Sequence, residues 1–216
     1  MNRRTLPVAV AAAATVSLLL TACGGGDDKT NDKIAGSEQS APPSASASPS
    51  ASPSDVTGRP KITLPADFKN EFEGWTTGDP VKDAVLTDVT HRINATDAAI
   101  ASDEPASPAI PFYYQRDALI GADKWIADYK KDGLTVTGTM RFFSPKIEVF
   151  SARSAAVTYC SDDTKAFNKD RKTGKVDMSA SSSPYVTYST ALEKNDKGIW
   201  QTTRLDSKRG DKTCAP

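Results

Sequence analysis

The stretch from Gly133 to Phe143, GLTVTGTMRFF, marks the point at which the hydrophobic pattern of this chain changes. Before it, apolar residues recur about every fourth position, as on one face of a helix. Within it and after it they recur at every second position, and β-branched and aromatic residues become frequent, which is typical of strands. The sequence therefore predicts helices first and strands second.

Two helices are predicted before this point. Asp79 is a suitable N-cap, and Pro80 fits the first helical position, where its missing amide costs nothing. An apolar stripe then follows at four-residue steps, formed by Val81, Val85, Val89 and Ile93, with Leu86, Ala99 and Ile100 beside it. The helix is expected to end at residues 103–105, Asp-Glu-Pro. A second helix is expected from Phe112 to Lys131, with Gly133 as a left-handed C-cap.

Five strands are predicted after Gly133. They are Thr135–Phe143, Lys146–Ser151, Ala155–Cys160, Tyr185–Glu193 and Ile199–Leu205. Residues 144–145 and 195–198 mark turns, and the polar residues 161–183 are expected to form a long exposed hairpin or loop. Helices gathered before antiparallel strands predict an α+β domain, with the N-terminal helices packed on one face of a curved antiparallel sheet.

The first 22 residues are a predicted lipoprotein signal peptide. Arg3 and Arg4 precede an uncharged apolar run, Val8 to Leu20, which is shorter than the roughly 20 residues that a membrane-spanning helix needs. Residues 20–23, Leu-Thr-Ala-Cys, resemble the lipobox of bacterial lipoproteins, in which a diacylglycerol is attached to the cysteine and the preceding peptide is removed. We therefore expect acyl chains on Cys23 to anchor the protein at the extracytoplasmic face of the cell membrane. The export route, Sec or twin-arginine, stays open.

Residues 23–60 are a predicted disordered tether, and residues 61–216 the single globular domain. The tether is rich in Gly, Ser, Ala, Pro and Asp, with a Ser-Ala-Ser-Pro alternation from Ser44 to Ser54. Such a segment cannot bury enough apolar surface to offset the entropy lost on ordering. A spacer is the interpretation we adopt, and recognition or O-glycosylation of the repeat is the alternative.

The order of elements resembles the NTF2-like, or cystatin-like, cone fold over residues 79–214. Further positions carry a closer resemblance to small lipoproteins of high-GC Gram-positive bacteria. They are Gly138, Arg141, Val157, Cys160, Asp162, Asp163, Asp170, Thr173, Gly174, Lys175, Gly198, Trp200, Gln201 and Cys214. This resemblance implies a fold and a cellular address, and it implies no catalytic or ligand-binding residue.

Charge and cysteine content narrow the function classes. The chain has 27 basic and 27 acidic residues, and loss of residues 1–22 removes two arginines, which leaves 25 against 27. No nucleic-acid partner is implied by this balance. Cys160 and Cys214 remain after Cys23, and outside the cytoplasm an even pair predicts a disulfide. Two inert thiols or a redox-active site are the alternatives, although no Cys-x-x-Cys is present.

Few residues suggest a site for metal or acid–base chemistry. The only histidine, His91, lies opposite the apolar stripe on a helical projection and is expected to face water. With one histidine, no soft-ligand metal site is expected, and we expect no cofactor. Asp162, Asp163 and Asp170 do not match a calcium-loop pattern and are interpreted as a solvated acidic loop. Residues 174–175, Gly-Lys, lack the rest of a phosphate-binding loop and are interpreted as a turn.

Aromatic residues offer the one opening for a ligand site. In a cone fold they would fill or line the space between the helices and the concave sheet. They are Tyr113, Tyr114, Trp125, Phe142, Phe143, Tyr159, Tyr185, Tyr188 and Trp200. Core packing is the favoured interpretation, and a pocket for a small apolar or amphiphilic ligand is the alternative.

The function expected first is a non-catalytic binding or regulatory module at the cell envelope. Its partner would be an envelope protein, such as a sensor kinase of an envelope-stress system, a cell-wall polymer or a small ligand. The alternative is a small-molecule-binding protein or an isomerase- or dehydratase-type enzyme with an apolar pocket, as the cone-fold resemblance implies. Asp117 and Asp123 on the second predicted helix are the candidate carboxylates, because an apolar pocket raises a carboxyl pKa. Oligomeric state is not predicted.

Overall fold

The computed structural model describes residues 58–104, 106–179 and 181–215. The predicted signal peptide, the lipid attachment at Cys23 and the tether as far as residue 57 lie outside the described residues. Within the described part of the chain, no helix is long and apolar enough to cross a membrane.

The first helix, α1 (Pro80–Ala101), begins where the sequence predicts. The Asp79 carboxylate accepts hydrogen bonds from the amides of Val81 and Lys82, at 2.9 and 3.2 Å. These bonds satisfy amides that have no partner inside the helix. The predicted apolar stripe is buried from Val85 onward, but Val81 in the first turn is 48% exposed. The stripe was therefore predicted correctly except at its first member.

The predicted second helix is two helices, α2 (Ala109–Tyr113) and α3 (Arg116–Lys131). Between them, Tyr114 forms a parallel bridge with Thr202, and the amide of Gln115 donates to the Thr202 carbonyl at 2.8 Å. An amide bound to a strand cannot also close a helical turn, so the prediction of one helix was wrong at this point.

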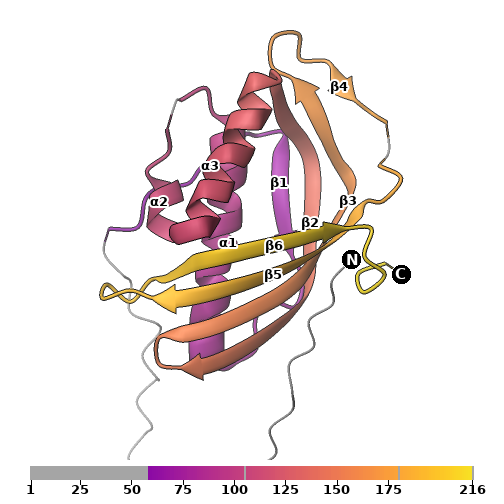
Figure 1. The fold of residues 1–216 in the computed structure, drawn as a ribbon. Coiled ribbons are helices and arrows are strands. Elements are labelled where there is room, and N and C mark those ends of the chain that lie inside the picture. Colours follow the sequence, from indigo (N-terminus) through magenta and orange to yellow (C-terminus); the bar gives the residue numbers. More distant parts are fainter. Residues whose placement is uncertain (1–57, 105, 180, 216) are drawn as a thin grey trace, which may run out of the picture. The chain divides into compact units, whose positions relative to one another are not determined.

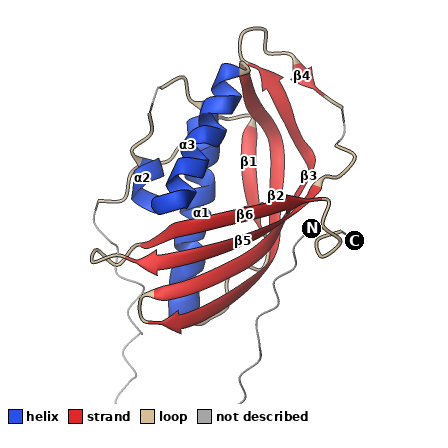
Figure 2. Ribbon diagram, viewed as in Figure 1, coloured by secondary structure: helices blue, strands red, loops and turns tan. Residues whose placement is uncertain are grey.

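The sheet has six strands. They are β1 (Phe68–Phe72), β2 (Leu134–Ser151), β3 (Ser154–Asp170), β4 (Val176–Asp177), β5 (Tyr185–Lys194) and β6 (Trp200–Arg209). Their order is β1-β2-β3-β5-β6, with β4 paired to β3. All neighbours are antiparallel except β1 and β2, which are parallel. The predicted class, α+β with helices on a curved and mainly antiparallel sheet, is confirmed (Figures 1 and 2).

The sheet curves where the pairing of β2 with β3 is irregular, between Thr139 and Arg141 and between Phe143 and Lys146, because such bulges bend a strand. In Figure 1 the long β2–β3 ribbon bends along its whole course. β5 pairs only with the Ser154–Asp162 half of β3. The remainder of β3 pairs with β2 and, at two positions, with β4. One part of the sheet is therefore broad, and the other is a narrow extension.

The strands differ from the prediction in three places. Residues 144–145 are not a turn but an irregularity within β2, where the pairing shifts between Phe143 and Lys146. The predicted hairpin or loop at 161–183 contains a hairpin, in which β3 continues along β2 to Asp170 and β4 pairs back on it at Asn168 and Lys169. A strand with one solvated face needs few apolar residues, which is why its sequence resembles a loop. β1 was not predicted, although its five residues alternate in burial.

Gly138 of β2 lies where β3 leaves no room for a side chain. It has a φ of +95°, and a Cβ built on it would lie 2.1 Å from the Lys165 carbonyl oxygen. Only glycine fits such a contact. The same residue pairs with Phe68 of β1, so it helps to hold three strands together.

Two clusters form the core. One lies around the first half of α1 and contains Trp75, Val85, Leu86, Val89, Ile93, Phe142, Ala155, Val157, Tyr159, Leu192 and Trp200. The other joins the second half of α1 to α2, α3, β1 and β2. The predicted disulfide is present: Cys160 on β3 is bonded to Cys214 after β6, with the two Cα atoms 5.5 Å apart.

Candidate functional site

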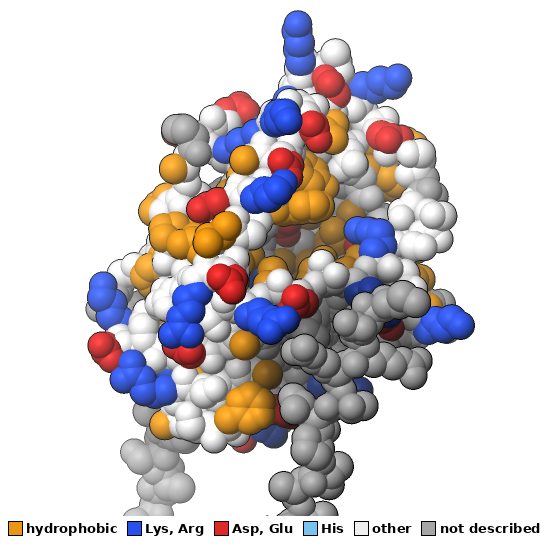
Figure 3. Space-filling view, in the orientation of Figure 1, with side chains coloured by type: hydrophobic (Ala, Val, Ile, Leu, Met, Phe, Trp, Pro, Cys, Tyr) orange, Lys and Arg blue, Asp and Glu red, His pale blue; other side chains and the backbone are white. Residues whose placement is uncertain are grey.

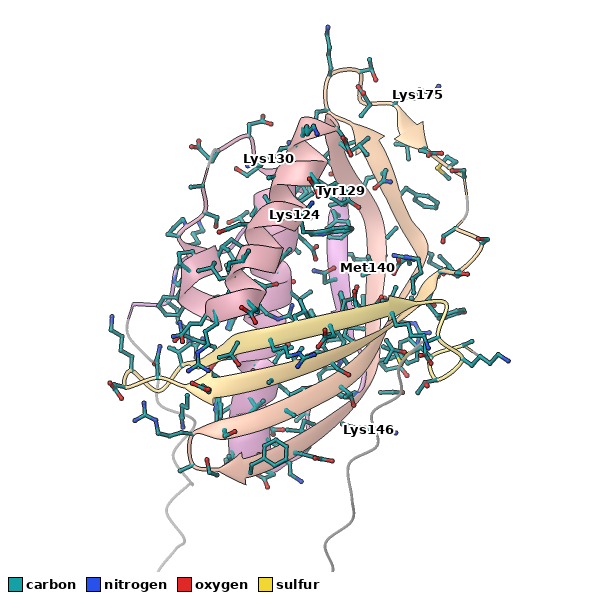
Figure 4. All side chains as sticks on the ribbon, in the orientation of Figure 1. Lys124, Tyr129, Lys130, Met140, Lys146 and Lys175 are labelled. Carbon is teal, nitrogen blue, oxygen red and sulfur yellow. A yellow bond between two sulfur atoms is a disulfide. The ribbon has the colours of Figure 1, made fainter. Side chains whose placement is uncertain are left out.

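A cavity of about 560 Å³ lies between α1, α3 and the concave face of the sheet. We call it the main cavity. Its apolar wall includes Phe68, Ile93, Ile100, Val136, Met140 and Phe142. Figure 3 shows this face hollowed between α3 and β6, with apolar side chains around the hollow. In Figure 4, Tyr129 on α3 and Met140 on β2 border the same space from two sides. The space between helices and sheet is therefore not completely filled by side chains.

The cavity exists because α3 presents small residues to it. Ala118, Gly121 and Ala122 line the wall at positions that share one face of the helix. A Cβ added to Gly121 would meet no atom within 4 Å. Larger residues at these positions would occupy the space, as the aromatic side chains do around the first half of α1.

Arg92 of α1 lies at the inner end of the main cavity and is only 3% exposed. Its Nη1 donates to the Tyr114 hydroxyl at 3.0 Å, and its Nη2 donates to the Tyr159 hydroxyl at 2.5 Å. Its Nε is buried and has no hydrogen-bond partner among the described residues. The Tyr114 hydroxyl also bonds to Thr96, at 2.8 Å. This group gives the cavity a cationic inner end.

Asp97 is a second charged group of the cavity and was missed by the sequence analysis. Its Oδ2 accepts a hydrogen bond from Asn70 of β1 at 2.7 Å. Burial raises the pKa of Asp97 to about 6, in spite of this hydrogen bond and the nearby charge of Arg92, and Asp163 adds to the rise. A carboxyl with this pKa exchanges its proton near neutral pH. The signal was present, because Asp97 follows Ile93 at the four-residue step of the apolar stripe.

The outer part of the cavity carries an ion pair. Arg209 of β6 lies 2.6 Å from Asp163 of β3, and Ser161 donates to the same carboxylate at 3.0 Å. Tyr188 stacks on Tyr159 with the ring centroids 4.9 Å apart. The charges of Arg209 and Asp163 therefore compensate each other. Arg92, further in, is not paired with a carboxylate among the described residues.

A smaller cavity of about 380 Å³ adjoins the main one. The two share Tyr129, Val136, Met140, Asp163 and Arg209. The smaller cavity continues along β3 and β4 past Asn168, to which Tyr129 donates at 3.2 Å.

The two aspartates predicted on the second helix differ in their position relative to the main cavity. Asp117 is exposed and lines the main cavity, whereas Asp123 is exposed and does not line it. Neither is a carboxylate enclosed by the apolar wall of the cavity. The carboxylate that is partly buried there is Asp97, on the other helix.

His91, which was predicted to face water, does so only in part. It is half-buried and stacks on Tyr113, with the ring centroids 5.6 Å apart. Burial lowers the pKa of His91, and the charge of Arg59 adds to this effect. Arg59 itself forms an ion pair with Asp88. The segment before β1 that contains Arg59 therefore covers a face of α1 that a helical projection would leave exposed. Nothing in the sequence of that segment indicates the contact.

The three aspartates of the predicted acidic loop belong to strand β3. Asp162 pairs with Arg141 at 3.1 Å, Asp163 pairs with Arg209, and Asp170 accepts from the Thr173 amide at 2.7 Å in the turn that contains Gly174 and Lys175. Among the residues that the structure describes, no group of three or more His, Cys, Asp or Glu side chains is placed to hold a metal ion.

Both interpretations of the aromatic residues apply, and some residues serve both. Tyr113, Tyr114, Phe142, Tyr159 and Trp200 are buried in the core clusters. Tyr114, Trp125, Phe142, Tyr159 and Tyr188 contribute to the cavity wall. Trp125 is 54% exposed and lies at the outer edge of the space.

The sequence matches no protein-family model and no curated relative. Similar solved structures include the intermembrane-space region of the chloroplast protein ARC6, which is 15% identical with a TM-score of 0.40 over 57% of this chain and 92% of that one. A ketosteroid isomerase-like protein from Erwinia carotovora atroseptica is 17% identical with a TM-score of 0.40, over 59% and 95%. A putative ketosteroid isomerase from Shewanella frigidimarina is 14% identical with a TM-score of 0.36, over 63% and 99%.

Proposed function

We propose that this protein is a lipid-anchored, extracytoplasmic binding module whose domain holds one small, partly apolar molecule in the main cavity. The observation that carries the proposal is the cavity itself, at about 560 Å³. Its volume lies within the roughly 300–1,000 Å³ typical of small-molecule sites, which combine apolar walls with a few polar groups.

The lining supports a ligand of mixed polarity. Aliphatic and aromatic side chains form the wall, and Arg92 and Asp97 supply polar groups at the inner part. A molecule that was entirely apolar would leave these groups without water or partners, which is costly. A fully polar molecule would gain little from the wall. The best match is therefore an amphiphilic compound.

Binding is tested with N-phenyl-1-naphthylamine, a neutral aromatic compound that fluoresces in apolar surroundings. Both core clusters and the disulfide lie within residues 58–215, so the chain from Gly24 onward can be used without its lipid. Gly121 is exposed and lines the main cavity, so Gly121→Leu adds a side chain at the mouth of the cavity, where a Cβ has free space. It should weaken binding at least roughly tenfold.

Ala127→Leu is the matched control. Ala127 is an exposed residue of α3 and does not line the main cavity, so the same side chain is added outside. This variant should bind like the unchanged protein. Equal binding by all three proteins would place the dye on the surface and contradict the proposal, as would absence of binding.

The anchor is tested separately at Cys23. Mass spectrometry of the native protein should find a diacylglyceryl group on this cysteine, and Cys23→Ala should move the protein out of the membrane fraction. Acyl chains supply about 0.8 kcal/mol per buried methylene, so their loss abolishes durable attachment. An unmodified Cys23 in membrane-bound protein would refute the anchor and leave the cavity proposal intact.

A second candidate function, acid–base catalysis, is favoured by Asp97 alone. A cavity carboxyl with a pKa of about 6 can take and return a proton near neutral pH. Incorporation of deuterium from heavy water into an enolisable cyclic ketone, followed by NMR, tests this. Exchange that Asp97→Asn abolishes would support catalysis, and exchange at the buffer rate in both proteins would count against it.

A further inference from the structure

Arg92 is a buried cation without an anionic contact. Arg59, Arg116, Arg141, Arg153, Arg171, Arg204 and Arg209 each form an ion pair within the described part of the chain. Arg92 forms none there, although at 3% exposure it is the most buried of the described arginines. Its contacts are the neutral hydroxyls of Tyr114 and Tyr159. Burying a charge without a counter-charge is costly, so this position needs another explanation.

Part of Arg92 lies where a ligand can meet it. Arg92 lines the main cavity, although its Nε, which has no partner among the described residues, is itself enclosed by protein atoms. A guanidinium has five N–H donors in a planar fork, which matches the two oxygens of a carboxylate. Two tyrosine hydroxyls use only part of this set. The remainder forms a donor group with a fixed direction, because the tyrosine contacts hold the guanidinium in place.

Nearby acidic groups do not fulfil the role of a counter-ion. Asp163 is paired with Arg209 at 2.6 Å. Asp97 forms no ion pair with Arg92 within 4.0 Å, and it is bound instead to Asn70. The inner cavity therefore gains a net positive charge whenever Asp97 is protonated.

We propose that the molecule held in the main cavity is an amphiphilic anion, whose acidic headgroup binds Arg92 and whose apolar body lies along Ile93, Ile100, Val136 and Phe142. This inference rests on the proposed binding function and specifies the chemical class of the ligand. The headgroup lies at the inner end, and the body extends toward Trp125, which is 54% exposed at the outer edge.

Asp97 makes the binding dependent on pH. When it is ionised, its charge repels an anionic headgroup, and when it is protonated the repulsion disappears. Several groups face Asp97 from the surrounding elements. They are Arg92 on α1, Asn70 on β1, Tyr129 on α3, Tyr159 and Asp163 on β3, Tyr188 on β5 and Arg209 on β6. Since burial raises the pKa of Asp97 to about 6, the affinity for an anion should rise as the pH falls through 6.

The test compares two dyes that differ by one charge. 1-Anilinonaphthalene-8-sulfonate has the skeleton of N-phenyl-1-naphthylamine with an added sulfonate, which is ionised throughout the pH range used. At pH 5 the sulfonate dye should bind roughly tenfold more tightly than the neutral one, the size of a hydrogen bond to a charged group. At pH 7.5 this preference should shrink, whereas binding of the neutral dye should stay constant.

Variants assign the effect to residues. Asp97→Asn should bind the sulfonate dye at pH 7.5 as tightly as the unchanged protein does at pH 5, and its pH dependence should be lost. His91→Gln is the matched control, because His91 is on the same helix and does not line the main cavity. It should keep the pH dependence. Arg92→Met should lose the preference for the sulfonate dye and retain the neutral one.

Each outcome distinguishes the two proposals. If the neutral dye binds, Gly121→Leu blocks it and the sulfonate gives no advantage at pH 5, the anionic ligand is wrong while the binding function stands. If neither dye enters the cavity, the binding function itself fails. A thermal melt shows whether Arg92→Met folds. If it does not fold, the comparison of the two dyes and the Asp97→Asn variant decide whether the ligand is an anion. If the preference for the sulfonate dye still depends on pH in Asp97→Asn, the proposed role of Asp97 is wrong.

Discussion

The two halves of α1 lie in contrasting surroundings. In the first half, Val85 and Val89 are completely buried against Leu192 and Trp200 of the broad part of the sheet. The second half faces the main cavity, and the same stripe there carries Asp97 in place of an aliphatic residue. One helix thus supports a filled core at one end and an open site at the other. The difference comes from the facing elements, which are bulky in the first case and small in the second.

The largest expected difference between the two halves of the domain is the loss in free energy of unfolding when a leucine side chain is truncated. Leu86 is 1% exposed in the packed half, so Leu86→Ala should lower the free energy of unfolding by about 2–5 kcal/mol. Leu205 is partly buried and lines the cavity, so its truncation enlarges an existing space and should cost about 1 kcal/mol. Chemical denaturation measures both, and equal losses would show that the cavity half is as tightly packed as the other.

A smaller effect, of opposite sign, is expected at Asp97. Since burial raises its pKa from 3.8 to about 6, the ionised carboxylate destabilises the folded protein above about pH 6. Asp97→Asn should therefore raise the free energy of unfolding at pH 8 by up to about 3 kcal/mol. The gain should vanish below about pH 4, where the carboxyl is protonated in both folded and unfolded chains. Denaturation at the two pH values measures this.

Asp88 of the packed half provides the contrast. It is 1% exposed, accepts from the Trp200 amide at 2.8 Å and pairs with Arg59. Asp88→Asn should destabilise the protein at pH 8, because one partner of a largely buried pair is removed. Stabilisation by this variant would contradict the distinction between a structural carboxylate and a cavity carboxylate.

The smallest expected effect concerns the small residues of α3. Gly121→Ala should stabilise the protein by about 0.5–1 kcal/mol, since alanine is the better helix former and its Cβ meets no atom within 4 Å. A rise of the melting temperature by a few degrees would show this. A loss of stability would mean that the wall at Gly121 is closed rather than open.

Local patterns predicted much of the fold. The cap at Asp79, the alternation after Gly133 and the pair Cys160–Cys214 are confirmed by the structure. The errors lie where a distant segment supplies the partner. The Thr202 carbonyl accepts a hydrogen bond from the Gln115 amide, which divides the predicted helix. Pairing with β2 keeps the polar half of β3 in a strand as far as Asp170.

The candidate site was predicted less well than the fold. Of the two aspartates selected on α3, Asp117 lines the cavity and Asp123 does not, and the carboxylate with the raised pKa is Asp97 on α1. Its position on the apolar stripe was visible in the sequence. What was not visible was whether the opposing surface would bury it in a packed core or leave it beside open space.

The sequence by itself determined the start of α1, the change from helical to strand periodicity, the disulfide and the order that makes this an α+β domain, because these depend on near neighbours, on periodicity and on two cysteines. Only the tertiary structure decided that Arg92 lacks a carboxylate partner among the described residues and that Ala118, Gly121 and Ala122 leave a cavity beside it. The physical reason is that a cavity is set by the difference between the volumes of facing side chains. That difference arises only when residues far apart in the chain are brought together.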